Sequence, residues 1–366
     1  MKNKILFFIQ LPPPVHGSSI VGKMILDNLK INNNFNTFYI NSLLSTNTGQ
    51  GNIFKTEKII SYFKIIRSFI KQVHSFKPDL FYIAMTASGI GFLKDFPFIL
   101  YCRLKKIKVV IHLHNKGIAK YSKNLIYRLL YFIVFKKSKV IVLSEKLLID
   151  IPNYINNNDI YICNNGMKKL VIQTPKKKTT KKVRILFISN LIESKGVFIL
   201  LESLKLLLEN NISFYCNIVG GVADVSEEIL LKKINDLGLL NYVKYLGKLY
   251  GEKKDKIFKE SDIFVFPTYY KNEAFPLVIL ESFMYGIPVI TTNEGGISDI
   301  VRNEINGLII KKESSYDAFR AIQKLVNEPR LYEKISLNCI NDFNNKYTKE
   351  IFDDRIYGIL KMIVSE

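Results

Sequence analysis

A strand-like run followed by a proline and a helical pattern constrains this chain more than any other feature. Residues 264–268 are apolar and contain a proline near their end, which is typical of a buried strand that stops there. Pro276 suits the first position of a helix, where its missing N–H costs nothing. Leu277, Leu280 and Met284 follow at helical spacing, so we expect them to face a core. The segment therefore predicts a strand, a loop and a helix in succession.

Two glutamates lie at the start of this predicted helix. Glu273 falls in the loop before it, and Glu281 about a turn and a half inside it. A helix N-terminus after a parallel strand presents free N–H groups to an anionic ligand. Carboxylates accept hydrogen bonds from a polyhydroxylated ligand. If the two glutamates are considered in isolation, an interpretation without function fits at least as well: Glu273 would be a charged loop residue and Glu281 a solvated helix residue.

The longer string closely resembles the nucleotide-sugar site of retaining family 4 glycosyltransferases, which have the GT-B fold. Glu273 and Glu281 match that family's E-x7-E signature, and the spacing agrees through Glu294-Gly295-Gly296 to Asn306-Gly307-Leu308. The resemblance implies that Glu273 meets hydroxyls of the donor sugar and that Glu281 binds the ribose. It also implies that the amides of Phe275 to Leu277 lie against the donor.

Length and composition favour a two-domain protein of a reducing compartment. The 366 residues fit two domains of common size. No apolar run approaches the ~18–20 residues that span a bilayer. Residues 1–9 superficially resemble a signal peptide, but Gln10 and three prolines follow without a cleavage site, so a first buried strand is the better interpretation. The four cysteines form no C-x-x-C pair, which favours the reduced cytosol.

The positive charge is concentrated in the first half. The formal net charge is +21; residues 1–170 hold 25 Lys+Arg against 7 Asp+Glu, and residues 171–366 hold 28 against 25. Such asymmetry indicates that the first half meets an anionic surface. The alternative is an AT-rich genome, which would impose lysine throughout but would not explain scarce acids in one half only.

Strand-like and helix-like segments alternate along the chain, which predicts parallel sheets with helices on both faces. The pattern runs through residues 1–167 and restarts over 183–345. Residues 168–182 hold seven lysines and few core residues, as expected of a linker. Residues 55–76 carry apolar residues at helical spacing interleaved with lysines. We expect this basic amphipathic helix to pack on a sheet, lie on a membrane, or do both. Phe63, Ile66 and Phe69 would add membrane insertion if exposed.

The resemblance extends to two loops that precede helices. Gly17 follows Pro12-Pro13-Pro14 and matches the family's N-terminal loop, with one glycine rather than a pair; a glycine allows close approach of a ligand, although most such glycines are merely turns. Lys195 supplies a cation to a diphosphate at a helix start. The family usually has arginine where Asn190 stands, so the diphosphate would depend more on Lys195 and backbone N–H groups. The alternative for Lys195 is a surface lysine at a helix start.

His112 and His114 share one face of a predicted strand. A histidine pair two apart could bind a metal, but no third ligand is evident. The resemblance implies that His114, at the strand's end, faces the donor sugar, whereas His112 is expected to be a core histidine with satisfied hydrogen bonds. Nothing resembles the aspartate-rich metal motif of other glycosyltransferases, so we expect neither a metal nor another cofactor.

The resemblance as a whole implies a retaining, hexosyltransferase-type enzyme of polysaccharide biosynthesis. It implies an α/β GT-B fold, with two Rossmann-like doubly wound parallel-sheet domains facing a cleft. The first domain would take the acceptor and the second a UDP- or GDP-sugar, and residues 346–366 would cross back onto the first. We expect a lipid-linked or cell-surface glycan acceptor and a cytoplasmic protein, peripheral on the inner face of the cell membrane. The implied catalytic residues are Glu273, His114 and Lys195, and the implied donor-binding residues are Gly17, Asn190, Lys195, Phe275, Pro276, Leu277 and Glu281.

Three other functions were weighed. A sugar-nucleotide epimerase can share the GT-B architecture, but the E-x7-E string argues against it. A nucleic-acid-binding protein would explain the charge, yet no recognised nucleic-acid motif accompanies it. A glycosidase would use two carboxylates at one bond, but it leaves the phosphate-loop features and the basic half without a purpose.

Overall fold

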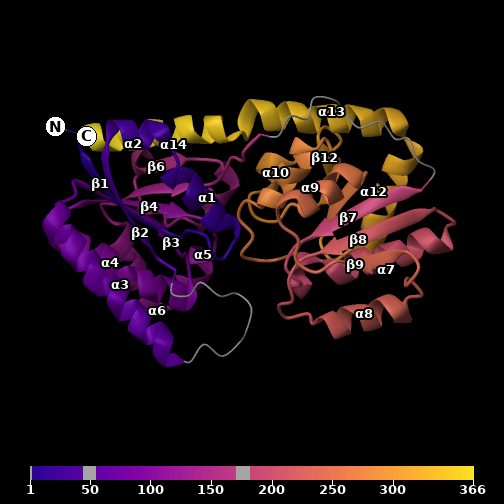
Figure 1. Ribbon diagram of the computed structural model, residues 1–366, viewed down its shortest axis with the longest axis horizontal. Coiled ribbons are helices and arrows are strands. Elements are labelled where there is room, and N and C mark those ends of the chain that lie inside the picture. Colours follow the sequence, from indigo (N-terminus) through magenta and orange to yellow (C-terminus); the bar gives the residue numbers. More distant parts are fainter. Residues whose placement is uncertain (1, 44–54, 170–181) are drawn as a thin grey trace. The chain divides into compact units, whose positions relative to one another are not determined.

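The computed structural model describes residues 2–43, 55–169 and 182–366, which divide into two compact units (Figure 1). The first unit comprises Met1–Gly166 together with Lys349–Glu366, and the second comprises Met167–Thr348. Residues 170–181, most of the predicted linker, lie outside the described residues. None of the helices in the described segments is long and apolar enough to cross a membrane.

The first unit is built on a six-stranded sheet in the order β2-β1-β3-β4-β5-β6, and all its strand pairs are parallel. Its central strands β3 and β4 are buried except for Lys108 at the start of β4, as their continuous apolar sequences predict. Because β2 and β3 flank β1, the chain reverses direction across the sheet at β1, and right-handed crossovers then place helices on both faces. The strands are β1 (Lys4–Ile9), β2 (Asn36–Asn41), β3 (Leu80–Met85), β4 (Lys108–Leu113), β5 (Lys139–Val142) and β6 (Ile160–Ile162).

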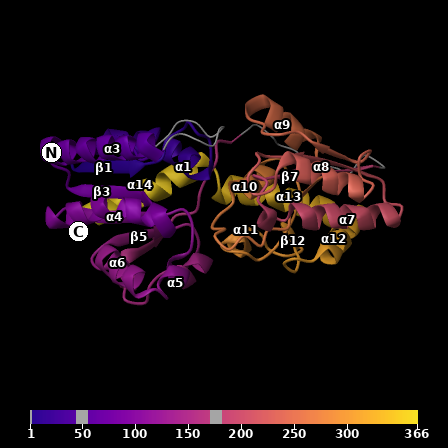
Figure 2. The same cartoon turned by 90° about the horizontal axis from the view of Figure 1, so that it is seen from below.

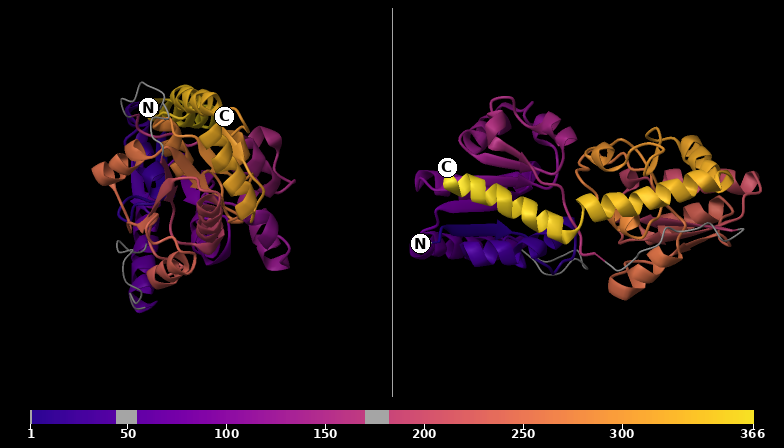
Figure 3. Two further views of the ribbon diagram at one scale, coloured as in Figure 1. Left: turned by 90° about the vertical axis from the view of Figure 1, so that its right-hand side faces the viewer. Right: turned by 90° about the horizontal axis from the view of Figure 1, so that it is seen from above.

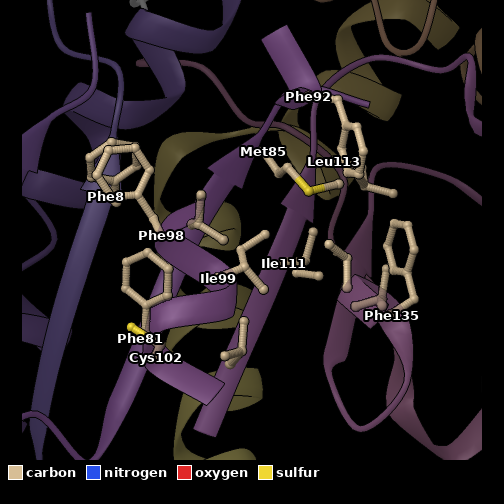
Figure 4. Packing of buried hydrophobic residues seen from close by; sticks show 14 of the residues in the cluster. Phe8, Phe81, Met85, Phe92, Phe98, Ile99, Cys102, Ile111, Leu113 and Phe135 are labelled. Atoms are coloured by element: carbon tan, nitrogen blue, oxygen red, sulfur yellow. The ribbon is translucent and has the colours of Figure 1, made fainter. Parts of the chain in front are cut away.

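Helices α3, α4 and α6 cover one face of this sheet, and their inner sides form its main core with the strands (Figure 1). Figure 4 shows Phe8 and Phe81 of the strands beside Phe98, Ile99 and Cys102 of α4. The helices of the first unit are α1 (Gly17–Leu26), α2 (Leu29–Asn34), α3 (Lys55–Phe76), α4 (Gly89–Leu104), α5 (Ile118–Tyr121), α6 (Leu125–Phe135) and α14 (Lys349–Ser365).

The last helix, α14, packs within the first unit although it ends the chain (Figure 3). It contacts α1 and α2. Asn28 donates a hydrogen bond to the carbonyl of Asp353, and the rings of Phe35 and Tyr357 lie 5.9 Å apart. Its apolar side is buried, namely Phe352, Ile356, Ile359, Leu360 and Ile363.

The second unit repeats the architecture with the order β12-β11-β10-β7-β8-β9. Here β8 and β10 flank β7, so the direction reverses between β7 and β10. Its strands are β7 (Val183–Ile188), β8 (Phe214–Val219), β9 (Val243–Tyr245), β10 (Ile263–Phe266), β11 (Val289–Thr291) and β12 (Gly307–Ile309). Its helices are α7 (Val197–Glu209), α8 (Glu227–Asp236), α9 (Gly251–Glu260), α10 (Leu277–Met284), α11 (Ile297–Ile300), α12 (Ser315–Asn327) and α13 (Pro329–Lys346).

The structure differs from the predicted elements in a few places. Two helices rather than one long one lie between β1 and β2: α1 ends at Leu26, and α2 follows because Asn28 accepts a hydrogen bond from the Ile31 N–H and caps a new helix. Pro276 is the residue before α10 rather than its first residue. Leu277 is only half-buried, whereas Leu280 and Met284 are buried as predicted.

Candidate functional site

Two loops meet at the carboxyl ends of β7 and β10, where the second sheet reverses direction. Open α/β sheets bind their ligands at such a switch point. Gly196 allows the meeting: its φ is +90°, and a Cβ there would lie 2.3 Å from the carbonyl oxygen of Pro267. The amide of Tyr269 also donates to the carbonyl of Ser194 at 2.8 Å. The loop after β7 is therefore fixed against the loop that carries the first glutamate.

Lys195 and Glu273 form an ion pair at this junction. Lys195 Nζ lies 2.5 Å from Glu273 Oε2, and both side chains are largely buried. The ammonium also lies 4.4 Å from the ring centre of Tyr270, an attractive position for a cation. The Thr268 hydroxyl lies 3.5 Å from the same carboxylate oxygen. Sequence analysis identified the two charged residues separately; the structure brings them together.

The glycine pair after Glu294 holds the loop of Glu273 in place. Gly295 has φ +57°, and a Cβ there would lie 2.0 Å from the carbonyl oxygen of Glu273. Gly296 donates its N–H to the carbonyl of Ala274 at 2.8 Å. These two residues of the signature therefore pack directly on the backbone of the first glutamate.

The start of α10 offers fewer amide donors than predicted. Pro276 has no N–H, so within residues 275–277 only Phe275 and Leu277 have an amide to donate. The Phe275 side chain is buried and its ring meets that of Tyr347 edge to face at 6.0 Å. Phe275 can thus contribute to a ligand site through its backbone alone.

Glu281 is paired with a lysine that sequence analysis missed. Lys254 Nζ, from α9, lies 2.6 and 2.7 Å from the two carboxylate oxygens, and both side chains are largely buried. Burial raises the pKa of the Glu281 carboxyl, and Lys254 acts against that rise. The only sequence signal was position: Lys254 precedes the buried Phe258 by four residues and so shares its helix face.

The two other loop residues are exposed. Asn190 lies at the end of β7, in the same loop as Lys195. Gly17 is the first residue of α1, whose N-terminus is capped by His16: its Nδ1 accepts from the Ser19 N–H, and the Ser19 hydroxyl accepts from the His16 N–H.

The two histidines of β4 differ in environment. His112 is fully buried; its Nδ1 is hydrogen-bonded to the Tyr82 hydroxyl, while its Nε2 has no hydrogen-bond partner among the described residues. The expectation that its hydrogen bonds are satisfied is therefore only half right. His114 follows the strand, with its ring centre 4.2 Å from that of His112. Loss of hydration, with a smaller effect of His16, lowers the pKa of His114 to about 4, so it is neutral at pH 7.

The predicted residues thus fall into two groups. Lys195, Asn190, Glu273, Phe275, Pro276, Leu277 and Glu281 belong to the second unit, and Gly17 and His114 to the first. Within the described ranges, no three His, Cys, Asp or Glu side chains gather as a metal site. Independence of metals and other cofactors stays a prediction.

Comparison with known proteins finds a family match in the second half of the chain. Residues 169–341, which contain the whole switch-point site, match the family model of glycosyl transferases group 1. The match covers just under half of the chain and supports a glycosyltransferase of group 1. The group 1 signature residues are then those that pack at the switch point, and Asn306, at its far end, is structural: its side chain is buried and donates to the Ile300 carbonyl and to Asp342.

Several curated relatives of this chain are glycosyltransferases. An uncharacterized glycosyltransferase of Methanocaldococcus jannaschii is 27% identical over 45% of this chain and 41% of that protein. The capsular polysaccharide biosynthesis glycosyltransferase CapM of Staphylococcus aureus is 23% identical over 84% of this chain and 83% of CapM. The UDP-Gal:alpha-D-GlcNAc-diphosphoundecaprenol alpha-1,3-galactosyltransferase of Escherichia coli is 28% identical over 45% and 42%. The first and third matches thus span less than half of the relative.

Solved structures share the fold of this chain. Sucrose-phosphate synthase of Thermosynechococcus elongatus superposes with a TM-score of 0.79 at 14% identity over the whole of both chains. Anabaena HepE in complex with UDP gives 0.75 at 17% identity over 98% of this chain and all of HepE. The predicted GT-B fold, with two Rossmann-like parallel-sheet domains, is confirmed.

Proposed function

We propose that the protein is a retaining glycosyltransferase that moves a hexosyl group from a UDP- or GDP-sugar to an acceptor hydroxyl. The observation that carries this proposal is the junction of Lys195 with Glu273 at the switch point, with Glu281 on the adjoining helix. A cation at a helix start suits a diphosphate, and buried carboxylates suit sugar hydroxyls.

The geometry suggests an order of events at Lys195. In the free protein its ammonium is neutralised by Glu273. On donor binding the ammonium would turn to the diphosphate, and the released carboxylate would accept hydrogen bonds from the donor sugar. Charge develops on the departing diphosphate, and a cation fixed nearby stabilises it. Glu273 and His114 act as positioning groups in this proposal, and neither is assigned as a nucleophile or a base.

We propose a lipid-linked or cell-surface glycan intermediate as acceptor, met at the inner face of the cell membrane. Support comes from two relatives, one named for capsular polysaccharide biosynthesis and one for galactosyl transfer to a diphosphoundecaprenol-linked sugar. The excess of lysine in the first half supports binding of this half to an anionic surface. The protein should pellet with anionic vesicles at low salt and not with neutral ones. Binding should weaken as the screening length shortens to ~8 Å.

A ligand screen tests the donor part of the proposal. Thermal shift with UDP, GDP and their sugar conjugates should show one nucleotide series stabilising the protein. Glu281→Gln should weaken that binding by roughly 1–3 kcal/mol, the scale for a hydrogen bond to a charged group. Unchanged affinity in a folded variant would remove the ribose role. Incubation of the donor alone separates the alternatives, because an epimerase would convert its sugar without an acceptor.

A further inference from the structure

Three neighbouring helices of the first unit expose apolar side chains on their outer faces. Helices α3, α4 and α6 lie in one layer, with α4 in contact with both of the others (Figure 2). Their inner sides are buried against the sheet, so the outer sides would be expected to be polar. They instead expose Ile59, Ile60 and Phe63 of α3, Ile90 and Leu93 of α4, and Leu125, Ile126 and Leu129 of α6, all in the first halves of these helices. We call these eight residues the apolar band. Ile70, Leu104 and Phe132 are exposed further along the same helices.

Helix α6 shows most clearly that the band needs a partner. Its sequence, LIYRLLYFIVF, is apolar on nearly every side. Tyr131, Val134 and Phe135 are buried, but Leu125 and Ile126 are 69% and 68% exposed. A helix that is apolar all round is normally buried all round. An exposed apolar patch rimmed by polar residues marks an interaction surface.

Helix α3 contributes to the band because it is longer than the sheet it covers. Its 22 residues span about 33 Å, whereas the six-residue strands beneath span about 20 Å. The helix meets the core only from Tyr62 onward, and there only with one of its faces. Phe69 is accordingly buried and Ile66 half-buried, so these two cannot insert, whereas Phe63 is 64% exposed.

The band lies at the edge of the sheet where α/β proteins bind their ligands. In a parallel α/β unit each helix starts at the carboxyl edge of the sheet and runs back to the amino edge. Eight of the eleven exposed large apolar residues described in these helices fall in the first half of their helix. His114 and Gly17, which follow β4 and β1, lie at that same carboxyl edge.

The charge of this region favours one kind of partner. Residues 55–137, which contain all three helices, hold 17 Lys+Arg against 3 Asp+Glu. One of the acids, Asp95, is buried and so does not offset the surface charge. Exposed basic side chains such as Lys64 and Arg67 of α3 and Arg128 of α6 accompany the band. A second copy of the chain would bring like charges together, whereas an anionic bilayer offers both phosphate groups and an apolar interior.

We propose that the apolar band inserts into an anionic bilayer and presents the carboxyl edge of the first sheet to acceptors held in that bilayer. The acceptor class in this inference rests on the proposed function. The assignment of the band as a membrane-binding surface rests only on its exposed apolar side chains and the charge around them. Electrostatic attraction brings the protein to the membrane, and burial of the band makes the contact apolar as well.

The chain has no tryptophan, so a single introduced indole reports on one place without background. Phe63→Trp tests the band. Tyr316→Trp, on α12 of the second unit, is the matched control, since Tyr316 is 60% exposed. With vesicles of equimolar phosphatidylglycerol and phosphatidylcholine, the emission of Phe63→Trp should shift to shorter wavelength and be quenched by lipids brominated in the acyl chain. Tyr316→Trp should do neither.

A double variant then measures what the band contributes. Leu125→Ser/Ile126→Ser changes only exposed residues and should lower partitioning into these vesicles about tenfold or more. Ile229→Ser/Leu240→Ser, at exposed positions of the second unit, should leave it unchanged. If the protein bound vesicles but the emission of Phe63→Trp did not shift, insertion of the band would be overturned. The same would hold if the protein bound an acidic protein but did not bind vesicles. Nucleotide affinity measured on the same variants separates failure of this inference from failure of the proposed function.

Discussion

At the scale of residues, each signature glutamate of the free protein is held by a lysine from another segment. Lys195 of the β7 loop contacts Glu273, and Lys254 of α9 contacts both oxygens of Glu281. Such pairs offset the cost of burying a carboxylate, because an unpaired charge in this environment would be costly. In the proposed function, the donor would take the place of each lysine at its glutamate, and mutation of one pair at a time tests the two contacts separately.

Glu273→Gln tests the exchange at Lys195. Removing the neighbouring negative charge leaves the ammonium free to attract a diphosphate, so bare nucleoside diphosphate should bind more tightly while sugar transfer is lost. Calorimetric titration and a transfer assay measure the two. Glu193→Gln is the control, since Glu193 is an exposed acid in the same loop. Weaker nucleotide binding in Glu273→Gln would contradict the exchange and place Glu273 on the nucleotide itself.

Lys254→Met should make stability depend on pH in a definite direction. Burial already raises the pKa of Glu281 above its ordinary value, with Asp255 adding to the rise, and loss of Lys254 raises it further. A group whose pKa is raised on folding loses its stabilising effect as pH rises through the folded-state value. The variant should therefore be destabilised by roughly 3 kcal/mol at neutral pH and above, with the deficit shrinking as the pH falls and the carboxyl takes up a proton. Denaturant melts at a series of pH values measure it.

The control for this variant is Lys256→Met, which removes an exposed lysine of the same helix. It should show no such trend. A deficit of Lys254→Met that stayed constant with pH would mean that Lys254 acts by packing rather than by charge. Lys254→Arg should restore most of the wild-type behaviour, because it keeps the positive charge.

At the scale of elements, the site depends on the short distance between the start of α7 and the end of β10. Gly196→Ala would place a methyl group against the Pro267 carbonyl and force a side chain into a left-handed backbone. We expect a loss of about 2 kcal/mol or more, together with weaker nucleotide binding because Lys195 is displaced.

Gly238→Ala separates the two causes. Gly238 also has positive φ, but a Cβ added there would meet no atom within 4 Å. It should lose only about 1 kcal/mol and leave nucleotide affinity unchanged. Equal losses of stability in Gly196→Ala and Gly238→Ala would show that backbone strain alone, and not the close approach of the two loops, accounts for the effect of replacing Gly196.

At the scale of the whole molecule, the C-terminal helix α14 is part of the first unit, which is otherwise formed by the N-terminal half of the chain. Deletion of residues 349–366 removes five buried apolar side chains from the first unit, each worth about 1.5–3 kcal/mol when fully buried. Hydrogen exchange should quicken throughout the first unit, while nucleoside diphosphate binding to the second persists. Met362→Ser, at an exposed position of α14, should change neither. Loss of nucleotide binding on deletion would contradict the assignment of the donor to the second unit.

The sequence by itself determined the strand and helix pattern, because continuous apolar runs such as those of β3 and β10 and the amphipathic period of α3 reflect local geometry. It also located Glu273, Glu281 and Lys195, since their spacing is fixed along the chain. Short elements such as α11 and β12 carry too few residues for a period to show.

Only the tertiary structure decided which charges pair and which apolar residues are exposed. Lys254 cannot be told from its neighbouring lysines until α9 packs beside α10, because pairing depends on distance between elements remote in sequence. Phe63 and Phe69 look alike along α3, yet one is exposed and the other buried, because they lie on different faces of the helix and only the face of Phe69 meets the core. Burial is a property of the assembled layers, and that is why the pairing and the exposed band could not be predicted from residue order.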